Sequence, residues 1–464
     1  MWNNKSLNEA LNVKLDLSLD GNLIVIDSRI IKKNAIFLAL KGENFDGHDF
    51  IEQAQNNGAK AAIVSKINKD VSIPQILVAD TYEALINLAK YRRKISKSIF
   101  IAITGSVGKT SYKEALSLIL NKYGATYKTS GNFNNHIGLP LCLANLDLNA
   151  KYSVFELAMN HSGEIKFLSD ILNPDIALIT KITDAHLGNF ANRDGIISAK
   201  AEICSGFYDN STIILNKNDE NYPKLREHII DKYHLKNKNI KSFGSSEDND
   251  LIIEEINIKE NKLFASINLE DKKYQINFSI YNKAVAEVIS SILLILRELN
   301  LDPEKGVSAF KDFKSLEGRG EISKINIENK KITLINDSYN ANYLSMKAAL
   351  ETLNFVASEN NNRKIAIIGD MLELGPDSDK FHLALKDIII ENNIDKIITV
   401  GKFMKKLYDE LPDNIKLLSY ETIPTDINSI ISSLKNNDVI LVKSSNSIKT
   451  SIIAKKLQEE NNAI

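Results

Sequence analysis

Short apolar runs recur along the whole chain, and each of them ends in glycine or polar residues. Runs of Ile, Val, Leu and Ala bounded in this way are typical of buried strands. Amphipathic segments between the runs, such as 112–121, place apolar residues at helical spacing. Strands that alternate with helices at intervals of roughly 25 to 35 residues predict a parallel, doubly wound α/β sheet. The expected strands lie at 23–26, 35–40, 61–64, 75–78, 99–103, 154–157, 176–180, 212–216, 332–335, 364–368, 396–401 and 439–443.

Breaks in this pattern divide the chain into three parts. A polar Ile-Ser-Lys-Ser stretch precedes residue 99, and a further segment begins near residue 314. Between 231 and 280, charged and apolar residues alternate, which favours an antiparallel insertion. We therefore predict three α/β domains. They are a small N-terminal domain at 1–97, a central doubly wound domain at 98–313 and a C-terminal Rossmann-like domain at 314–464.

One stretch combines a strand, a glycine turn and a helix in the order of a phosphate-binding loop. The motif T-G-S-V-G-K-T-S at 104–111 follows the expected strand at 99–103. This order directs backbone N–H groups and a helix N-terminus at an anion. Lys109 would add a charge for the β/γ-phosphates, and Thr110 would offer its hydroxyl to Mg²⁺. The central sheet is therefore predicted to be of the P-loop type. The residues expected to contact the nucleotide are Thr104, Gly105, Ser106, Val107, Gly108, Lys109, Thr110 and Ser111.

The glycine motif departs from the standard spacing G-x-x-x-x-G-K-[ST], because residue 103 is Ile. An ordinary glycine turn before a helix is the competing interpretation.

Composition narrows the class of protein. The 464 residues are 44% hydrophobic and 25% charged, which is ordinary for a globular chain. A net charge of −1 argues against a protein that coats nucleic acid. The two cysteines, Cys142 and Cys204, show no C-x-x-C spacing, so we expect neither a disulfide framework nor a Cys-based zinc site. No signal peptide is evident, and the most apolar run, 289–296, is too short to span a bilayer. We expect a cytoplasmic monomer without nucleic-acid partner or membrane insertion.

Several polar residues are candidates for chemistry beside the glycine loop. Glu156 ends one expected strand and His186 follows another, so both should lie at the same sheet edge as the loop. Magnesium prefers oxygen ligands, whereas a lone loop histidine is more often structural. On spacing alone, Lys200 is expected to be a solvated helix side chain. Arg319 lies between two glycines and is either a surface cation or a group that stabilises a transferring γ-phosphoryl. An NTP hydrolase or motor, a kinase and an acyl-phosphate-forming ligase all fit these residues.

Taken in order, the motifs of the chain resemble those of the Mur ligases. D-S-R and A-L-K-G-E-N-F-D-G-H resemble the UDP-sugar-binding end of that family, and the short glycine loop resembles its ATP loop. The motifs D-S-Y-N-A-N and G-D-M-L-E-L-G are similar to those of the members that add D-alanyl-D-alanine. The matching stretches lie at 27–29, 39–48, 104–111, 131–140, 156–165, 185–187, 199–203, 337–342 and 369–375.

The resemblance implies a role for each matching residue. Lys200 falls where the family carries a carbamylated lysine that helps to hold a second Mg²⁺. The implied catalytic residues are Lys109, His186, Lys200 and Arg319, and the implied metal ligands are Thr110, Glu156, His186 and Lys200. Further nucleotide contacts fall on Asn282, Arg319, Asp337, Tyr339 and Asn340. The implied substrate contacts are Ser28, Arg29, Phe45, Asp46, Gly47, Asn134 and Asn135.

The chain departs from the family's motifs at a few positions. Residues 279–282 read Ser-Ile-Tyr-Asn instead of Gly-x-His-Asn, and Val285 replaces a second Asn. Lys181 stands where the family has an Asn, Asn446 where it has an Arg, and His136 where many members carry an acid.

The function implied by the resemblance is an ATP- and Mg²⁺-dependent ligase. It would join D-alanyl-D-alanine to UDP-N-acetylmuramoyl-tripeptide through an acyl-phosphate, in cytoplasmic peptidoglycan precursor synthesis. Two alternatives stay open. One is the Mur ligase that adds diaminopimelate or lysine, although its D-N-P-R motif is absent from this sequence. The other is a non-catalytic nucleotide-binding module on the same scaffold.

Overall fold

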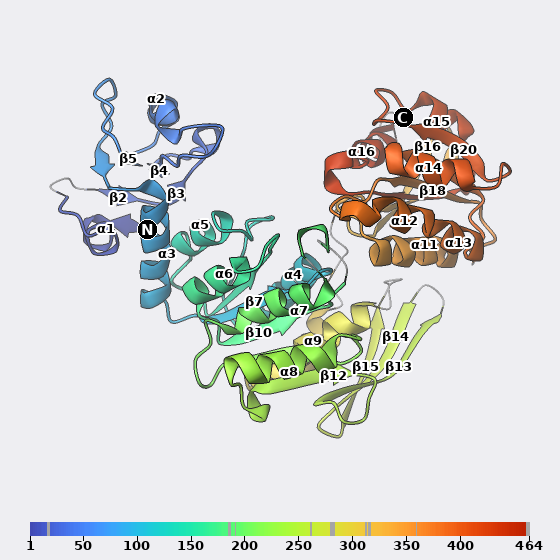
Figure 1. Cartoon of the computed structure of the whole chain (residues 1–464), viewed down its shortest axis with the longest axis horizontal. Helices are drawn as coiled ribbons and strands as arrows, with labels where there is room; N and C mark the ends of the chain where they lie inside the picture. Colours follow the sequence, from blue (N-terminus) through green and yellow to red (C-terminus); the bar gives the residue numbers. More distant parts are fainter. Residues whose placement is uncertain are drawn as a thin grey trace.

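Three lobes make up the molecule (Figure 1). The computed structural model describes residues 1–15, 19–183, 187–190, 192–259, 262–278, 284–310, 313, 317–358 and 360–460. The N-terminal lobe holds the elements from residue 2 to 95, the central lobe those from 99 to 310, and the C-terminal lobe those from 321 to 460. In Figure 1 the blue N-terminal lobe and the orange-to-red C-terminal lobe stand on either side of the central one.

The N-terminal lobe is built on a parallel sheet whose described strands follow the order β3-β4-β5-β6. All four strands predicted in this part of the sequence are confirmed. The sheet strands are β3 (Ile24–Val25), β4 (Ile36–Leu38), β5 (Ala61–Val64) and β6 (Gln75–Leu77), and β1 (Trp2–Asn3) pairs separately with β2 (Asp20–Gly21). The helices are α1 (Asn4–Leu11), η1 (Ser28–Ile30), η2 (Gly47–Phe50), α2 (Ile51–Asn56) and α3 (Thr81–Ile95).

One large sheet forms the central lobe. Its strands are β7 (Ile99–Thr104), β8 (Thr126–Lys128), β9 (Tyr152–Glu156), β10 (Ile176–Ile179), β11 (Thr212–Asn216), β12 (Ile240–Gly244), β13 (Leu251–Lys259), β14 (Lys262–Leu269) and β15 (Lys272–Phe278). In the described residues they lie in the order β15-β14-β13-β12-β11-β10-β7-β9-β8. From β8 to β13 all neighbours pair in parallel, and the last two pairs are antiparallel.

Helices cover both faces of this sheet, as the doubly wound prediction requires. Ile101 and Ile103 of β7 pack against the face of α4 and α9, while Phe100 and Ala102 pack on the opposite face with α5, α6 and α7. Because β7 lies between β9 and β10, the chain reverses its winding direction at β7, the place where such sheets bind ligands. The helices of the lobe are α4 (Lys109–Leu120), α5 (Gly138–Ala144), α6 (Glu164–Leu172), η3 (Leu187–Asn189), α7 (Arg193–Ala201), η4 (Glu202–Cys204), α8 (Tyr222–Tyr233), η5 (Asn237–Asn239), α9 (Ala284–Glu298) and α10 (Pro303–Phe310).

The antiparallel part of the central lobe is smaller than the sequence predicts. The stretch 231–280 begins inside α8, and β12 pairs in parallel with β11. The prediction was wrong there because β12 reads Ile-Lys-Ser-Phe-Gly, so its polar residues imitate the alternation of a half-exposed strand. From β13 to β15 the pairing is antiparallel, but these strands extend the main sheet instead of forming a sheet of their own.

The C-terminal lobe contains a second mainly parallel sheet with helices on both faces. Its described strands follow the order β16-β17-β21-β18-β19-β20, and β16 with β17 is the antiparallel pair. The strands are β16 (Glu321–Ile327), β17 (Lys330–Asn336), β18 (Lys364–Gly369), β19 (Lys396–Val400), β20 (Lys416–Tyr420) and β21 (Val439–Lys443). The helices are α11 (Tyr343–Ser358), η6 (Gly375–Asp377), α12 (Ser378–Leu383), α13 (Leu385–Glu391), α14 (Lys402–Glu410), α15 (Asn428–Ser433), η7 (Asn446–Ile448) and α16 (Ser451–Glu460).

The N-terminal lobe is fastened to the central lobe at the end of α5. The Asn145 side chain accepts from the backbone N–H of Ile24 and donates to its carbonyl, both at 2.8 Å. Buried Trp2 donates from Nε1 to the Ala144 carbonyl at 3.0 Å, and the Arg92 guanidinium lies over its ring. These paired bonds fix one lobe on the other through main chain and buried side chains.

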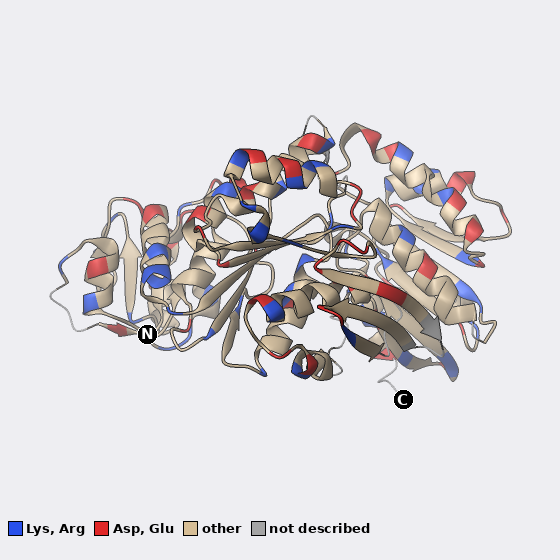
Figure 2. Cartoon of the chain, turned by 90° about the horizontal axis from the view of Figure 1, so that it is seen from below, with Lys and Arg blue, Asp and Glu red and all other residues tan. Residues whose placement is uncertain are grey.

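Charged residues of both signs occur along the helices of all three lobes. Figure 2 shows positions of Lys and Arg interspersed with positions of Asp and Glu along the helices. Cys142 and Cys204 are buried free thiols. Among the described helices, none combines the length and the apolar character that a membrane crossing requires.

Candidate active site

The glycine loop between β7 and α4 is shaped by close contacts. A Cβ on Gly105, whose φ is 148°, would lie 1.9 Å from the Thr180 hydroxyl oxygen, so the position has no room for a side chain. Gly108 is the N-cap of α4 with a φ of 84°, and no side chain caps this helix. The first N–H groups of a helix lack intrahelical acceptors. The open N-terminus of α4 therefore suits an anion.

This loop is tied to the segment that follows β10. The Ser106 N–H donates to the Lys181 carbonyl at 2.7 Å, and the Ser106 hydroxyl accepts from the Thr183 N–H at 3.0 Å. The Thr180 hydroxyl donates to the Val107 carbonyl at 2.7 Å. Lys181 accepts through its backbone carbonyl. The presence of Lys where the family has Asn therefore leaves the hydrogen bond with Ser106 unchanged.

Lys109 lies at the first turn of α4 and is half-buried. Its Nζ donates to the Gly105 carbonyl at 2.8 Å, so the ammonium is held over its own loop. Burial lowers the pKa of Lys109, Glu156 and Glu373 raise it, and Arg319 lowers it. The loop thus carries a cation whose surroundings include two carboxylates and a guanidinium.

Glu156, at the end of β9, is buried and held at both carboxylate oxygens. Oε2 accepts from the Thr110 hydroxyl at 2.9 Å, and Oε1 accepts from Asn134 Nδ2 at 2.9 Å. The Nζ of fully buried Lys113 lies 3.9 Å from Oε2 and donates to the Thr129 and Gly131 carbonyls. Glu156 and Thr110 are therefore two fixed oxygen donors beside the phosphate loop.

The C-terminal lobe reaches this group through Arg319. Its Nη2 donates to the Thr110 hydroxyl oxygen at 3.0 Å, although the two residues lie 209 positions apart in the sequence. The guanidinium lies over the Tyr339 ring, 3.9 Å from its centroid. Arg319 is thus not an isolated surface cation but a half-buried contact between two lobes at the glycine loop.

The D-S-Y-N-A-N segment is fixed by buried Lys443 at the end of β21. Lys443 Nζ donates to Asp337 Oδ2 at 2.7 Å and to the Asn340 carbonyl at 2.9 Å. Burial raises the pKa of Asp337, and the charges of Lys443 and Arg319 lower it. The segment presents Tyr339 and exposed Asn340 to the same cleft as the glycine loop.

Lys200 of α7 is not the solvated side chain that spacing alone favours. It is 1% exposed, because α7 packs its Lys-bearing face into the lobe. Burial lowers the pKa of Lys200 well below its ordinary value, and the charge of Lys109 adds to this, against the opposing effects of Glu156, Glu164 and Glu202. These neighbours place Lys200 in the electrostatic surroundings of the phosphate loop.

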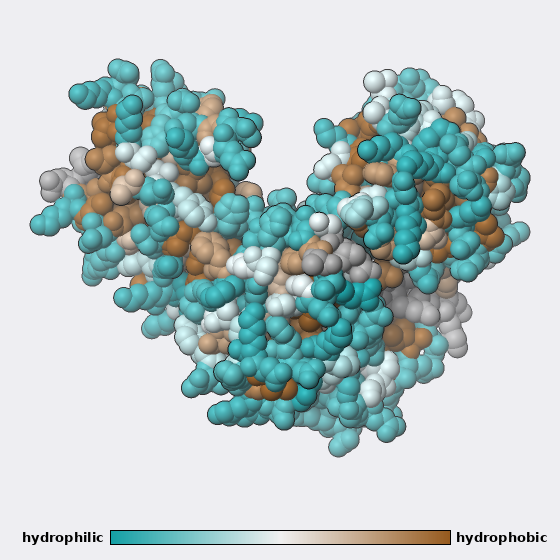
Figure 3. All heavy atoms as spheres, viewed as in Figure 1, coloured by the Kyte–Doolittle hydropathy of each residue, from teal (hydrophilic) through white to brown (hydrophobic). Residues whose placement is uncertain are grey.

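A cleft of about 1560 Å³ contains most of the residues discussed so far. Lys109, Thr110, Glu156 and Asn134 line it from the central lobe, and Arg319 is among the residues from the C-terminal lobe. Figure 3 shows a wide gap between the N-terminal and C-terminal lobes, with the central lobe at its base. His186 and Asn282, two predicted site residues, lie outside the described residues.

The donor set fits Mg²⁺ better than a metal held by protein side chains alone. In the described ranges, no three His, Cys, Asp or Glu side chains gather to hold a metal ion. Magnesium is usually held by one or two protein oxygens together with phosphate oxygens and water. Thr110 and Glu156 provide such oxygens next to the open N-terminus of α4.

The predicted substrate residues fall into two groups. Ser28 is buried and donates to Gln53, while exposed Arg29 pairs bidentately with Asp27. Phe45 is 58% exposed at the tip of the loop after β4. The residues of this N-terminal group are Ser28, Arg29, Phe45, Asp46 and Gly47.

Asn134 and Asn135 lie in the central lobe instead. Asn134 contacts Glu156, and the Asn135 side chain caps the start of α5 by accepting from the Gly138 N–H at 2.8 Å. Asn134 thus lies beside the glycine loop. Asn135 stabilises the start of α5, the helix whose other end contacts the N-terminal lobe.

Sequence reasoning missed three residues around the site. Lys113 and Glu202 are buried charges, but their positions on helices give no sign of burial. Glu202 accepts from the backbone N–H groups of Gly163 and Lys166 at the start of α6, beside the segment that follows β9. Glu373 is part of a quoted motif, yet no role was expected for it.

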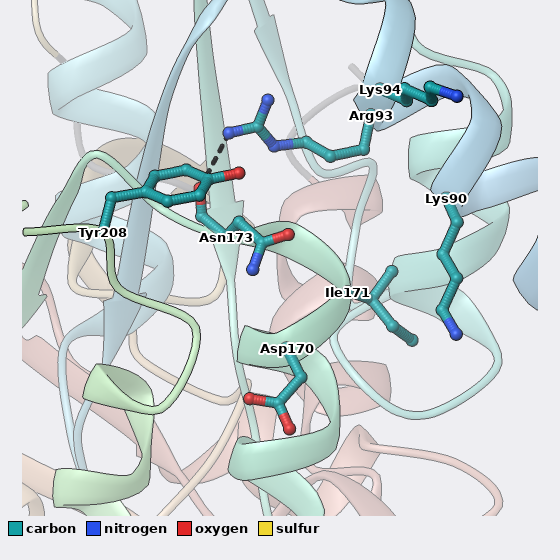
Figure 4. Close-up of a pocket in the computed structure, with 7 residues that line it drawn as sticks. All are labelled: Lys90, Arg93, Lys94, Asp170, Ile171, Asn173 and Tyr208. Carbon is teal, nitrogen blue, oxygen red and sulfur yellow. Dashed lines mark hydrogen bonds between the residues drawn. The ribbon is translucent and has the colours of Figure 1, made fainter. Parts of the chain in front are cut away.

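A second, smaller pocket of about 370 Å³ lies away from the glycine loop (Figure 4). Arg93 extends across it toward Tyr208 and donates to the carbonyls of Leu172 and Asn173, which end α6. These residues precede β7 and β10, so the pocket lies at the opposite edge of the sheet. Arg93 thus caps the C-terminal end of α6. We do not regard this pocket as the active site.

Family models match three successive parts of the chain. The model described as "Mur ligase family, catalytic domain" matches residues 22–93, "Mur ligase middle domain" matches 103–287, and "Mur ligase, glutamate ligase domain" matches 318–446. Together with the doubly wound sheet and the short glycine loop, these matches define the class: the chain belongs to the Mur ligase family.

Within the family, the similar proteins have one name in common. UDP-N-acetylmuramoyl-tripeptide–D-alanyl-D-alanine ligase of Rickettsia prowazekii is 38% identical over 452 residues, which cover 97% of this chain and 98% of the relative. A crystal structure of MurF from Acinetobacter baumannii superposes with a TM-score of 0.85 at 30% identity, covering 99% of both chains. MurF ligase from Thermotoga maritima, solved in complex with ADP, gives a TM-score of 0.79 at 26% identity, with 95% of this chain and 98% of that chain covered.

Proposed function

We propose that this chain is an ATP-dependent ligase that joins D-alanyl-D-alanine to UDP-N-acetylmuramoyl-tripeptide. The observation that carries the proposal is the junction at Thr110, which donates to Glu156 and accepts from Arg319 of the C-terminal lobe. A site assembled from two lobes can close over a nucleotide and a second substrate. The names of the similar proteins support the identity of the two substrates.

Each of the three domains would then bind a different substrate. The N-terminal domain, 1–97, would bind the UDP-sugar-peptide, and the exposed Phe45 offers a ring to a base or sugar. The central domain, 98–313, would bind ATP. The C-terminal domain, 314–464, would close on the nucleotide and bind the incoming dipeptide. Closure also keeps water from a reactive acyl-phosphate.

The nucleotide would lie with its phosphates on the N-terminus of α4. Lys109 would leave the Gly105 carbonyl for the β/γ-phosphates, and Arg319 would stabilise charge on the γ-phosphoryl group. Asp337, Tyr339 and Asn340 would contact the rest of the nucleotide, and Asn282 remains a predicted contact. Mg²⁺, when bound to Thr110, Glu156 and the phosphates, would offset the repulsion between phosphate and carboxylate.

Lys200 is the proposed site of carbamylation. A lysine reacts with CO₂ through its neutral amine, and burial lowers the pKa of Lys200 well below its ordinary value. Carbamylation would add a carboxylate to this buried amine, which suits a second metal ion. His186 remains a predicted metal ligand.

The reaction would proceed in two steps. First, the terminal carboxylate of the tripeptide attacks the γ-phosphorus, the bond to the ADP oxygen breaks, and an acyl-phosphate forms. The D-alanyl-D-alanine amine, after losing its ammonium proton, then attacks the acyl carbon, so that a C–N bond forms, the acyl C–O bond to phosphate breaks, and inorganic phosphate and a second proton leave. The first step brings two anions together, and the second brings two large substrates together. Orientation by lobe closure would therefore supply much of the rate enhancement.

Phosphate release with varied acceptors tests this function. With UDP-N-acetylmuramoyl-tripeptide and ATP, release should require D-alanyl-D-alanine and should not occur with diaminopimelate, lysine or single D-alanine. Lys109→Ala should lower turnover by at least about a hundredfold, as loss of a transition-state charge does, whereas Lys97→Ala, an exposed cation before β7, should not change it. Release that needs a single amino acid instead, or nucleotide binding without any turnover, would overturn the proposal.

A further inference from the structure

Glu373 of the C-terminal lobe lines the cleft that also contains the glycine loop. It is exposed, and it lines the same cleft as Lys109 and Arg319. It belongs to the loop between β18 and η6, which holds the motif G-D-M-L-E-L-G. The proposed function described above gives this carboxylate no part.

The backbone of Glu373 is in the left-handed region, with a φ of 66°. Residues with a Cβ seldom adopt this conformation, and Gly, Asn or Asp would adopt it more readily. Strained residues of this kind persist where their surroundings hold them, and they cluster at functional sites. The left-handed backbone therefore makes Glu373 a candidate functional residue.

Contacts on both sides hold the strained residue in place. Before it, the Met371 N–H donates to buried His382 at 2.9 Å, and the Leu372 N–H donates to the Ser445 hydroxyl at 2.9 Å. After it, Leu374 is buried in the lobe. Since its neighbours are anchored inward, the loop presents Glu373 outward to the cleft.

The loop also touches the central lobe. Gly375 packs against Gly188, since a Cβ on Gly188 would lie 3.1 Å from Gly375 Cα and 3.7 Å from the Glu373 carbonyl oxygen. Gly188 belongs to η3, which follows β10 at the same sheet edge as the glycine loop. From this place the Glu373 carboxylate raises the pKa of Lys109, opposing the effect of burial.

Glu373 therefore adds a negative charge to the cleft that also holds Lys109 and Arg319. The amine of an incoming dipeptide carries a positive charge near neutral pH, because its pKa is about 8. It must reach the acyl carbon next to the transferred phosphate. We propose that Glu373 binds the ammonium group of the incoming D-alanyl-D-alanine and positions it at the acyl carbon, where the ammonium loses one proton to the Glu373 carboxylate or to water and the neutral amine attacks. This inference rests on the proposed function and names the residue that selects an amine-bearing acceptor.

Steady-state kinetics of the full chain test the inference with Glu373→Gln, which removes the charge and keeps the shape. Loss of a charge-assisted hydrogen bond should raise KM for D-alanyl-D-alanine at least about tenfold. KM for ATP should stay within about twofold. Asp377→Asn changes an exposed carboxylate of the neighbouring η6 that is not among the residues lining the cleft; it is the matched control and should leave both values unchanged.

Two further measurements separate the possible failures. Glu373→Gly relieves the left-handed strain, so it should fold at least as well as the unmodified chain and show the same rise in KM. Hydroxylamine, an uncharged nucleophile that intercepts acyl-phosphates, should give hydroxamate equally with the unmodified chain and with Glu373→Gln. An unchanged KM for the dipeptide in either variant, or a parallel loss of hydroxamate, would overturn the role of Glu373. Failure of the unmodified chain to use the dipeptide would instead overturn the proposed function.

Discussion

Lys113 and Lys200 are both lysines shielded from water, yet their surroundings differ. Lys113 donates to two backbone carbonyls, lies 3.3 Å from Glu114 Oε1 and faces Glu156, so its charge is matched on several sides. For Lys200, burial and the charge of Lys109 lower the pKa. Lys113 is therefore held by several matched contacts beside the site, whereas burial shifts Lys200 toward its neutral form.

At the residue scale, Lys113→Met should destabilise the central lobe. Removing the cation leaves Glu156 and two carbonyls without their partner, which costs about 3–5 kcal/mol for a buried pair. For a lobe of this size the loss corresponds to a fall in Tm of roughly 10 °C, measurable by thermal unfolding. Lys166→Met, which removes an exposed i,i+4 ion pair with Asp170, is the control and should change Tm little. Equal Tm values for the two variants would contradict the holding role of Lys113.

The sequence could name most of these residues but not their burial. The chemistry of Lys109, Thr110 and Glu156 follows from motif and strand order. The burial of Lys200 depends on which face of α7 packs into the lobe, and a nine-residue helix with few strongly apolar positions does not decide this. The resemblance to a family, and not the spacing, pointed to Lys200.

At the scale of elements, the loops at the strand ends contain the site residues. Buried polar side chains fix these loops through hydrogen bonds. His382 of α12 is an example. Its Nε2 accepts from the Met371 N–H, while Nδ1–H donates to the Ser378 carbonyl at 2.6 Å, which requires the neutral ring. Burial lowers the pKa of His382 from its ordinary 6.5. The loop that presents Glu373 thus depends on an uncharged histidine.

This dependence predicts a pH effect on the C-terminal lobe. Below about pH 6.5 the unfolded chain binds a proton at this histidine that the folded lobe does not accept until lower pH, so stability falls as the pH falls. The slope attributable to His382 is at most about 1.4 kcal/mol per pH unit. His382→Gln should remove this slope, as measured by hydrogen exchange of peptides from the loop between β18 and α12 after correction for intrinsic rates. Identical slopes in both proteins would contradict the assignment.

Element prediction succeeded for strands that are continuous apolar runs and failed for strands that carry charged or polar residues. Interior strands such as β11 and β21 are continuous apolar runs because both of their faces are covered. The edge strands β16 and β20 were missed, since they are only half-buried and carry charged or polar residues. Helix packing onto the two sheets, by contrast, follows from the alternation of strands and helices.

At the scale of the whole molecule, the arrangement of the lobes brings distant residues together. The sequence predicts three α/β units, but it contains no signal that Arg319 reaches Thr110 or that Gly375 meets Gly188. Such contacts depend on how the units are placed and not on local periodicity. The N-terminal lobe is fixed through Trp2 and Asn145, whereas the C-terminal lobe meets the central lobe through Arg319 at Thr110 and through Gly375 at Gly188. Closure of the C-terminal lobe is therefore the motion expected during the reaction.

The fate of the carboxylate oxygen tests the central claim most directly. UDP-N-acetylmuramoyl-tripeptide labelled with heavy oxygen in its terminal carboxylate would be incubated with the chain, ATP, Mg²⁺ and D-alanyl-D-alanine, and the released phosphate analysed by mass spectrometry. If the site transfers the γ-phosphoryl group to the carboxylate, one labelled oxygen appears in each phosphate released. Phosphate without label would mean that water or another group received the phosphoryl, and it would contradict the account.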